Sequence, residues 1–319
     1  MRCRKCDRPA AINMRQHKLG LCEIHYPEWF IAQTQRAIEK YHMFGPQERV
    51  LVAVSGGKDS LGLWDVLLKL GYHADGLYID LGIGATAEGV RYSAASREKV
   101  RQFAAQHSDA QFAVVDLPGE YGETLPEVAR RVRRGQDKPC SVCGLIKRHA
   151  MNRVARDGGY GVLVTGHNLD DEAAVLFGNV LHWQTGYMAR QAPLLTEEAG
   201  LARKAKPFCR FYERETAAYT LISSIDYIYE ECPYSVGATS LEHKGVLNQM
   251  EQESPGTKLQ FYLGFLRARQ AGFFHEELED VALAPCPNCS QPTSAPGLCT
   301  FCRLWEPRTA PATPQAPPR

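Results

Sequence analysis

The stretch "RVLVAVSGGKDSLGLWDVLLKLG" at 49–71 constrains the fold more than any other part of this sequence. It begins with a short, apolar, β-branched run typical of a buried strand, turns through a pair of glycines, and continues with the spacing of an amphipathic helix. The order recurs, because "DGLYID", "QFAVVDL" and "GVLVTG" resemble further strands and helical segments separate them. This alternation predicts an α/β fold, with a parallel sheet covered by helices on both faces.

Composition limits the class of protein. A chain of 319 residues with 44% hydrophobic side chains can form one large core plus small appendages. Its 37 basic and 36 acidic residues nearly cancel, so any nucleic-acid surface must be a local patch. No apolar run is long enough to span a bilayer, and the N-terminus is charged, so we expect no membrane association and a cytoplasmic protein.

Changes in composition divide the chain. We predict a cysteine and histidine module at 1–27, a linker helix at 28–45, a catalytic domain at 46–280, a four-cysteine module at 281–305 and a disordered proline-rich tail at 306–319. In a reducing compartment, the eleven cysteines favour metal binding or thiol chemistry over disulfides.

The hexapeptide "SGGKDS" between the first strand and its helix predicts a phosphate site. Its members are Ser55, Gly56, Gly57, Lys58, Asp59 and Ser60. The glycines let the backbone approach an anion, and the helix N-terminus supplies N–H groups and positive dipole. The spacing is not that of a Walker A loop, which disfavours a GTPase or a kinase. The alternative is an ordinary glycine turn.

A second loop, "TGHNLDDEA" at 165–173, follows the fourth strand. In open parallel sheets ligands bind beyond the carboxyl ends of the strands, so this loop and the hexapeptide should converge. Asp170 and Asp171 offer hard oxygen ligands for a phosphate-bound Mg²⁺, or a group that orients a reactant. The alternative is helix N-capping by the acidic pair.

The terminal cysteines form two sets with the spacing of structural zinc sites. The first set is Cys3, Cys6, Cys22 and His25, and the second is Cys286, Cys289, Cys299 and Cys302. Four soft ligands in two close pairs suit a closed tetrahedral Zn²⁺ site, which leaves no open position for catalysis. We therefore expect two structural Zn²⁺ ions.

The remaining cysteines are candidates for chemistry. Cys140 and Cys143 precede a probable helix, whose dipole, together with Lys138 and Lys147, should lower the thiol pKa of the pair. Folding could bring Cys232, in "EECPYS", to the same place. Cys209 has apolar neighbours and is best interpreted as a small buried side chain.

Read in order, these motifs resemble one family over nearly all of residues 1–305. Their order is similar to that in the TtuA-type tRNA 2-thiouridine synthetases, of the TtcA/TtuA family of PP-loop ATPases. The matching motifs are the N-terminal cysteine and histidine module (the first knuckle), "SGGKDS", "PCSVCGLIKRH", "TGHNLDDEAAVLFGN", "ECPYSVGA" and the C-terminal four-cysteine module (the final knuckle). The resemblance implies that Cys140, Cys143 and Cys232 hold a [4Fe–4S] cluster with one iron open to a sulfur donor. Without it, the residues also allow a persulfide or disulfide relay between Cys140 and Cys143, or a structural pair.

The resemblance further implies the reaction. ATP, with Mg²⁺, adenylylates the C2 carbonyl oxygen of a tRNA uridine, and sulfur then replaces that oxygen. Lys147 and Asp171 match the family's catalytic positions, where Lys147 would stabilise phosphate charge. The matching positions that contact ATP are Ala53, Asp59, Ile79, Lys147 and Gly166. For Lys147 the alternative is a solvated helix lysine.

A tRNA substrate needs a basic surface. One basic segment, "RRVRRGQDK" at 130–138, precedes the central cysteines. A second basic group lies in the N-terminal module and consists of Arg2, Arg4, Lys5 and Arg8. A solvated charged face is the alternative for each patch. The resemblance also implies a homodimer and a ubiquitin-like sulfur carrier that ends in a thiocarboxylate.

Other functions compete with this interpretation. The segments "GNVLHW", "ARQAPLL" and "SPGTKLQFYLGFL" resemble the T-loop enzymes more than the wobble-uridine enzymes, which implies the T-loop uridine or ribothymidine as the target. Cytidine thiolases of the TtcA type lack the terminal knuckles. An ATP-dependent amidating synthetase has no need of the three central cysteines, and a non-catalytic tRNA-binding zinc protein would tolerate replacement of Lys58 and Asp171.

Overall fold

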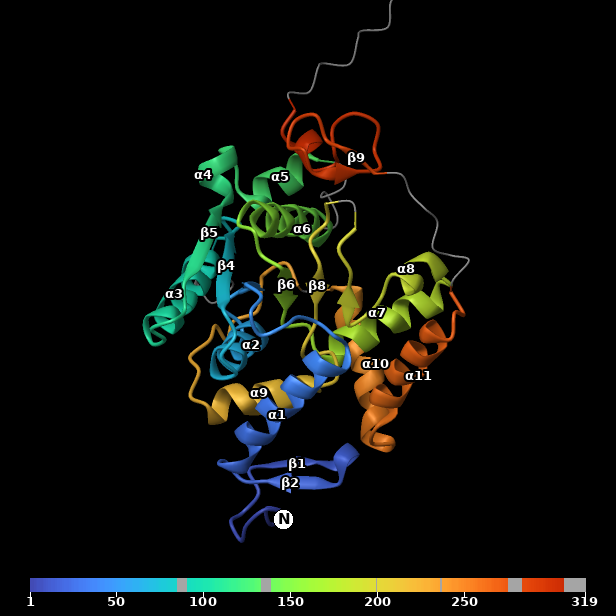
Figure 1. Cartoon of the computed structure of the whole chain (residues 1–319). Coiled ribbons are helices and arrows are strands. Elements are labelled where there is room, and N and C mark those ends of the chain that lie inside the picture. Colours follow the sequence, from blue (N-terminus) through green and yellow to red (C-terminus); the bar gives the residue numbers. More distant parts are fainter. Residues whose placement is uncertain (85–90, 133–138, 199, 236, 275–282, 307–319) are drawn as a thin grey trace, which may run out of the picture.

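The computed structural model describes residues 1–84, 91–132, 139–198, 200–235, 237–274 and 283–306. A large sheet domain forms the middle of the molecule (Figure 1). The N-terminal module lies at one end beside α1 and α9, and the C-terminal module lies at the other end beside α5 and α6. The two terminal modules therefore lie far apart in space.

The central sheet has six strands in the order β5-β4-β3-β6-β8-β7. They are β3 (Val50–Ala53), β4 (Ala74–Asp80), β5 (Phe112–Asp116), β6 (Val162–Thr165), β7 (Leu194–Leu195) and β8 (Lys204–Ala205). The first five in that order are parallel, and only β7 runs antiparallel. The predicted parallel sheet is confirmed, and its four predicted strands are β3 to β6.

Both faces of this sheet are buried, as a parallel sheet requires. Val50 and Val52 pack into the cluster that contains α2, while Leu51 between them packs into the cluster that contains α6. All three are fully buried. Because side chains alternate along a strand, the uninterrupted apolar run of β3 serves two helical layers at once.

The helices follow the strands and cover the sheet (Figure 1). They are α1 (His25–Lys40), α2 (Lys58–Lys69), α3 (Tyr92–Ala105), α4 (Leu117–Tyr121), α5 (Leu125–Arg131), α6 (Pro139–Asp157), α7 (Leu169–Leu181), α8 (Thr185–Ala189), α9 (Glu213–Ile222), α10 (Thr239–Glu253) and α11 (Thr257–Gln270). Two short 3-10 helices are Arg15–His17 and Cys302–Leu304. None of the helices in the described residues is both long and apolar enough to cross a bilayer.

The N-terminal module is a hairpin of β1 (Ile12–Met14) and β2 (Leu19–Leu21) joined to the main core. Helix α1 already begins at His25, so the boundary predicted at residue 27 falls inside it. Tyr26 and Phe30 on this helix are fully buried, and the Tyr26 hydroxyl donates to the backbone carbonyl of Glu215 at 2.7 Å. The module is thus anchored on α9.

The C-terminal module contains the hairpin of β9 (Ala284–Pro285) and β10 (Pro292–Thr293). Phe301 and Leu304 share an apolar cluster with Val142 and Ile146 of α6. This packing places the module directly on the helix that begins with the central cysteines. Of the predicted tail, residues 307–319 lie outside the described residues.

Candidate active site

The hexapeptide loop connects β3 to α2, with Gly57 as the helix N-cap. The backbone N–H of Ser55 donates to Ser60 Oγ at 3.0 Å, and the Ser60 hydroxyl in turn donates to the Gly57 carbonyl at 3.0 Å. Ser60 is buried and closes the loop from inside. The loop is therefore held in shape before any anion binds, as a phosphate site at a helix N-terminus should be.

At two positions of the predicted site, another part of the backbone lies so close that only glycine fits. Gly56 has a φ of 78°, and a Cβ there would lie 2.6 Å from the carbonyl oxygen of Ser96. A Cβ on Gly166 would lie 2.8 Å from the backbone carbonyl of Asp59. Gly166 thus lets the loop after β6 pack against the start of α2, because β3 and β6 are neighbours in the sheet.

One cavity of about 140 Å³ brings four of the predicted nucleotide residues to two of the predicted cysteines. The other predicted nucleotide residues are not among its lining, and these are Gly56, Gly57, Lys58, Asp59, Ser60 and Gly166. Ala53 and Ser55 contribute from β3 and its loop, and Ile79 from β4. The other side is formed by Cys143 and Lys147 of α6, one helical turn apart, together with Met151 and Cys232. Residues separated by more than 170 positions in the chain therefore meet at the carboxyl ends of β3 and β4, as predicted.

Cys140 joins the same neighbourhood from the first turn of α6. Its thiol donates to the Tyr234 carbonyl at 3.2 Å, which ties α6 to the segment that carries Cys232. Among the described residues, these three cysteines are not part of any group whose ligand atoms all lie within 4.8 Å of one another. They are too widely spaced for one tetrahedral ion, whereas a four-iron cluster holds its thiolates on separate irons. The donor set fits such a cluster.

The expected lowering of the thiol pKa values is wrong for Cys143. Burial raises the pKa of Cys143, and Lys147 offsets only part of the effect. Burial also raises the pKa of Cys232. Lys138, the other predicted cation, lies outside the described residues. A raised pKa leaves less thiolate at neutral pH, so these two thiols are weak free nucleophiles, and a metal that bound to them would have to replace their protons.

Asp171 occupies the first turn of α7, where Asn168 is the N-cap. The Asn168 side chain accepts the backbone N–H of Asp171 at 3.2 Å, and the Asp171 carboxylate accepts the Asn168 N–H at 3.0 Å. The remaining Asp171 oxygen lies 2.7 Å from Lys244 Nζ. Asp171 therefore takes part in the helix cap, as the alternative interpretation expected. The cap uses only one of its two carboxylate oxygens.

Asp170 has a different role from its neighbour. Its Oδ1 lies 2.5 Å from Lys258 Nζ, and its Oδ2 accepts the backbone N–H of Glu213 at 2.9 Å. Both side chains of the Asp170–Lys258 pair are buried. Within the described part of the chain, Asp170 is not in any group of close metal-ligating side chains. The Asp170 carboxylate connects α7 to α9 and α11, whereas the Asp171 carboxylate contacts Lys244.

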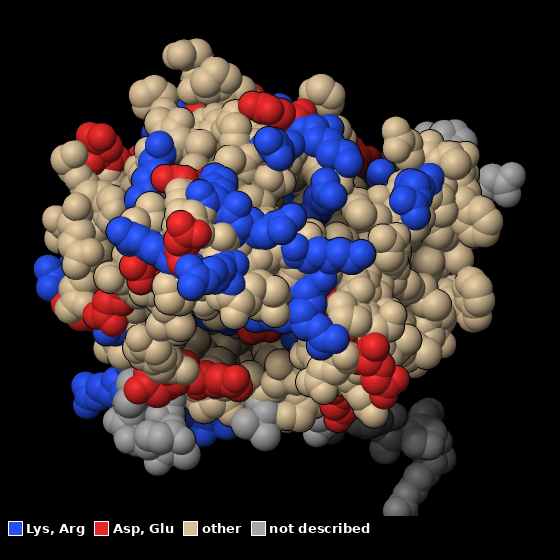
Figure 2. All heavy atoms as spheres, turned by 90° about the horizontal axis from the view of Figure 1, so that it is seen from below, with Lys and Arg blue, Asp and Glu red and all other residues tan. Residues whose placement is uncertain are grey.

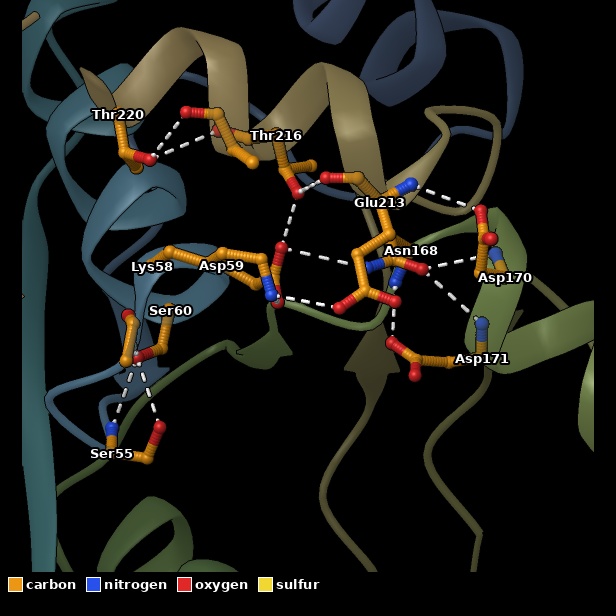
Figure 3. A network of polar contacts seen from close by, with 12 residues as sticks. Ser55, Lys58, Asp59, Ser60, Asn168, Asp170, Asp171, Glu213, Thr216 and Thr220 are labelled. Atoms are coloured by element: carbon orange, nitrogen blue, oxygen red, sulfur yellow. Dashed lines mark hydrogen bonds and ion pairs between the residues drawn. The ribbon is translucent and has the colours of Figure 1, made fainter. Parts of the chain in front are cut away.

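A polar network surrounds Lys58 and Asp59 at the start of α2 (Figure 3). Lys58 Nζ donates to Glu213 Oε1 at 2.8 Å and to Asp59 Oδ2 at 3.2 Å. Asp59 also accepts from the Thr216 hydroxyl and from Asn168 Nδ2. Burial raises the pKa of Asp59, against the opposing effect of Lys58. Burial likewise opposes ionisation of Glu213, but Lys58 and Lys244 lower its pKa to about 2.

Sequence reasoning missed Glu213, Thr216 and Lys244. Glu213 and Thr216 belong to α9, and Lys244 belongs to α10. No local spacing could have found them, because Glu213 lies 155 residues from Lys58 in the chain. The buried Cys209, by contrast, is confirmed as a core side chain without exposure, and burial raises its pKa to about 12.

The N-terminal set of four candidate ligands comes together as its spacing predicts. The ligand atoms of Cys3, Cys6, Cys22 and His25 all lie within 4.8 Å of one another. His25 Nδ1 is 3.4 Å from Cys22 Sγ and 3.5 Å from Cys3 Sγ. This arrangement has the donor chemistry and the closeness that a tetrahedral ion requires.

The C-terminal set contains a ligand that the sequence pattern does not indicate. His149 of α6 groups with Cys289, Cys299 and Cys302, and its Nε2 is 3.4 Å from Cys289 Sγ. Cys286, the fourth predicted ligand, has its Sγ 3.8 Å from Cys302 Sγ. Burial lowers the pKa of His149 to about 4, which keeps the ring neutral. His149, Cys289, Cys299 and Cys302 thus form one close group, and Cys286 lies beside it, next to Cys302.

The basic patches predicted for RNA are only partly described. In the first, Lys5 lies 3.7 Å from Glu28, and Arg8 lies 3.4 Å from Glu23. In the second, Arg131 pairs with Glu123 at 2.6 Å, and residues 133–138 lie outside the described residues. These acidic partners reduce the charge that either patch offers to a phosphate backbone.

Comparisons with known proteins agree with the motifs. Residues 2–27 match the family model of the N-terminal LIM domain of the 2-thiouridine synthetase TtuA. The chain is 49% identical over 306 residues to the tRNA-5-methyluridine(54) 2-sulfurtransferase of Thermus thermophilus, covering 96% of this chain and 91% of the relative. It is 40% identical to the enzyme of the same name from Thermotoga maritima, covering 95% and 96%.

The fold has its own match among solved structures. The U34-tRNA thiolase NcsA from Methanococcus maripaludis, a structure with its [4Fe–4S] cluster, superposes with a TM-score of 0.76 and covers 95% of each chain. Because the two sequences are only 20% identical, this match establishes the fold and nothing about the reaction. The similarity to the Thermus and Thermotoga enzymes extends over almost the entire length of each chain, so the resemblance seen in the motifs is confirmed and this protein belongs to the tRNA-5-methyluridine(54) 2-sulfurtransferase family.

Proposed function

We propose that this protein is an ATP-dependent tRNA 2-thiolase that acts on the T-loop ribothymidine named in its relatives, position 54. One observation supports the proposal above the others. The cavity that Ala53, Ser55 and Ile79 line on one side is lined by Cys143, Lys147 and Cys232 on the other. A nucleotide bound there has its reacting phosphate between the anion-binding loop and the cysteines.

In the first step the uridine O2 forms a bond to the α-phosphate of ATP, and pyrophosphate leaves with the electrons of the broken P–O bond. The hexapeptide loop binds the departing pyrophosphate through its backbone N–H groups and Lys58. Lys147, on the cavity wall, stabilises the charge that develops on the α-phosphate. Asp171, which matches the family's catalytic position, lies at the start of α7 and orients the uridine or the Mg²⁺ that accompanies the phosphates.

In the second step a sulfur nucleophile attacks C2, the C2–O bond breaks, and AMP leaves with the former O2 oxygen. A [4Fe–4S] cluster held by Cys140, Cys143 and Cys232 supplies an iron without a protein ligand, at which sulfur can be delivered. Cys143 and Lys147 lie on successive turns of α6, so one rigid helix positions both the sulfur side and the phosphate side.

The tRNA backbone docks on the face formed by the N-terminal module, α1 and the start of α9. Lysines and arginines gather on this face (Figure 2). Arg15 and Arg214 line one cavity at this end of the molecule, and Arg36 and Arg210 line another. Clustered cations of this kind bind phosphates without reading sequence. The start of α9 also carries Glu213, so this face adjoins the polar network around Lys58.

We also propose the partners and metals that the family resemblance implies. The protein takes its sulfur from a ubiquitin-like carrier with a C-terminal thiocarboxylate and works in the cytoplasm. Each terminal module holds one Zn²⁺, which the close groups of cysteine and histidine ligands support. The protein forms a homodimer, for which exposed Val175, Leu181, Trp183 and Tyr187 on and beside α7 and α8 offer an apolar surface.

The decisive experiment is nucleoside mass spectrometry of tRNA from a strain that lacks the protein. We expect the thiolated T-loop ribothymidine to disappear, and to return with the wild-type protein and with Cys209→Ala. Lys147→Met, Asp171→Asn and a Cys140→Ser, Cys143→Ser, Cys232→Ser variant should not restore it. Cys209 is the matched control, because it is a cysteine of the same domain that lies in the core.

The outcomes separate the competing functions. Loss of sulfur from the anticodon fragment would identify a wobble-uridine thiolase, the reaction named for the structural neighbour. Unchanged thiouridine would contradict thiolation altogether and favour an amidating synthetase or a non-catalytic RNA-binding protein. Absorption spectra of anaerobically reconstituted protein test the cluster separately, and the triple serine variant should stay colourless.

A further inference from the structure

Glu213, at the start of α9, bridges two lysines from different parts of the fold. Its Oε1 lies 2.8 Å from Lys58 Nζ in the anion-binding loop (Figure 3). Its Oε2 lies 3.1 Å from Lys244 Nζ on α10. Lys244 also contacts Asp171 at 2.7 Å. A single carboxylate therefore spans both ammonium groups, so the two lysines are close enough for one diphosphate to span them as well.

This arrangement occupies the loop lysine before any ligand arrives. A lysine that binds phosphate must present its ammonium group to the incoming oxygens. Here two of its contacts are the carboxylates of Glu213 and Asp59. A triphosphate that approached this geometry unchanged would meet three carboxylates, those of Asp59, Asp171 and Glu213, near the two cations. Like charges at such range repel, so at least one carboxylate must move or be neutralised.

Glu213 is the one free to move. Asp59 accepts hydrogen bonds from Thr216 and Asn168, and Asp171 accepts the Asn168 N–H within its helix cap. The side chain of Glu213 is the most exposed member of the network, at 37%, and the two lysines are its ion-pair partners. Both of its side-chain contacts are ion pairs with lysines, whereas Asp59 and Asp171 are also held by hydrogen bonds from Asn168.

We infer that Glu213 is an internal anion that holds Lys58 and Lys244 in the free enzyme and releases both to the phosphates of the nucleotide, which makes Lys244 a second phosphate-binding lysine. The inference rests on the proposed use of ATP. It adds a residue of α10 to the phosphate site and gives the site an exchange of anions as its first event. Lys244 then keeps its second contact, to Asp171, and links the phosphate to that carboxylate.

The displaced side chain has a place to go. Glu213 also lines a cavity of about 390 Å³. Its walls include two arginines, Arg15 and Arg214, together with Glu251 and the Asp170–Lys258 pair. A rotated carboxylate can exchange the two lysines for these arginines, so its charge is not left without partners.

Calorimetric titration of full-length protein with inorganic pyrophosphate and with ATP, without tRNA, tests the inference. Lys244→Met should weaken pyrophosphate binding by at least about tenfold, since a hydrogen bond between charged groups is lost. Lys244→Arg should restore most of it. Glu213→Gln should bind pyrophosphate more tightly than the wild type, because the competing negative charge is gone. Lys69→Met is the control, since Lys69 pairs with Asp65 at 2.8 Å at the far end of α2.

Two results would overturn the inference. The first is that Glu213→Gln binds pyrophosphate no more tightly than the wild type, while thermal unfolding shows an intact fold. Glu213 would then have only a structural role. Lys244→Met that binds pyrophosphate normally, yet loses thiolation as Asp171→Asn does, would restrict Lys244 to positioning Asp171. A wild-type protein that shows the expected binding pattern but leaves tRNA unthiolated would contradict the proposed function and leave the phosphate site standing.

Discussion

The ammonium group of Lys258 lies 2.5 Å from the Oδ1 atom of Asp170, and both side chains are only 4% to 5% exposed. Lys258 also donates to Asn248 Oδ1 at 2.6 Å, so this one cation joins α11 to α7 and to α10. Asp170 in turn accepts the N–H of Glu213. A buried pair therefore sets the positions of the helices from which Asp171, Glu213 and Lys244 reach the site.

Breaking that pair from one side should cost more than removing it entirely. Asp170→Asn or Lys258→Met leaves an uncompensated buried charge, so we expect a loss of about 3–5 kcal/mol in the free energy of unfolding. The double variant Asp170→Asn, Lys258→Met should lose less than either single change. Denaturant unfolding of the four proteins measures this, and additive single effects would contradict a direct ion pair.

The two glycines of the loop should respond differently to alanine. Gly56 has a φ of 78° and a Cβ there would lie 2.6 Å from a backbone carbonyl, whereas the nearest atom to a Cβ on Gly57 is the Ser55 hydroxyl at 3.5 Å. Gly56→Ala should therefore lower the free energy of unfolding by about 2 kcal/mol or more, and Gly57→Ala by less than about 1 kcal/mol. The comparison is made by denaturant unfolding without nucleotide, and equal losses would contradict it.

Glu215 should make the fold less stable as the pH rises toward neutrality. Burial raises its pKa from 4.5 to about 7, against the hydrogen bonds from the Tyr212 N–H and Gln16. Between those values the native state binds a proton that the unfolded state has lost, so stability falls with rising pH. His17, 3.8 Å away, has a lowered pKa and acts with the opposite sign. The comparison therefore needs a variant that changes Glu215 alone.

Glu215→Gln keeps an acceptor for the Tyr212 N–H and removes the titration. The stability difference between wild type and variant should change by about 3 kcal/mol between pH 4.5 and pH 7.5, to the disadvantage of the wild type at the higher pH. Chemical unfolding at several pH values provides the measurement. A difference that stays constant over this range would show that Glu215 titrates normally in the folded protein.

The sequence predicts those parts of the site that depend on neighbouring residues. The strand, glycine turn and helix around Ser55–Ser60 form as expected, because local periodicity and helix capping determine them. The strands β7 and β8 were missed, since two residues each are too short to show any period. They add to an edge whose position depends on the sheet already built.

What the sequence does not predict are contacts made across the fold. Lys58 meets Glu213, and Asp171 meets Lys244, only because α9 and α10 pack beside the loop and α7. The error on the thiol pKa of Cys143 has the same origin, because the helix dipole and Lys147 were visible in the sequence whereas burial was not. His149 is one further case, since its partner Cys289 lies 140 residues away.

His149 and Cys286 compete for one place in the proposed C-terminal zinc site, since a structural zinc ion takes four ligands and Cys289, Cys299 and Cys302 supply three of them. Cys286 Sγ accepts the backbone N–H of Cys299 at 3.3 Å, as Cys299 Sγ accepts that of Cys302 at 3.4 Å. Hydrogen bonds from N–H groups favour a thiolate, so we expect the four cysteines to hold the ion. His149 then contacts the site from α6 and stacks on Phe301.

Zinc analysis by mass spectrometry distinguishes the two sets. Cys286→Ser should reduce bound zinc from about two ions per chain to about one, because the N-terminal set keeps its own ion. His149→Phe preserves the ring that stacks on Phe301 and removes its nitrogens, so it should retain both ions. The reverse pattern would make His149 the ligand. In that case the metal would bind α6 directly, and chelation of zinc should then also lower the occupancy of the cluster proposed at Cys140 and Cys143, because both lie at the start of the same helix.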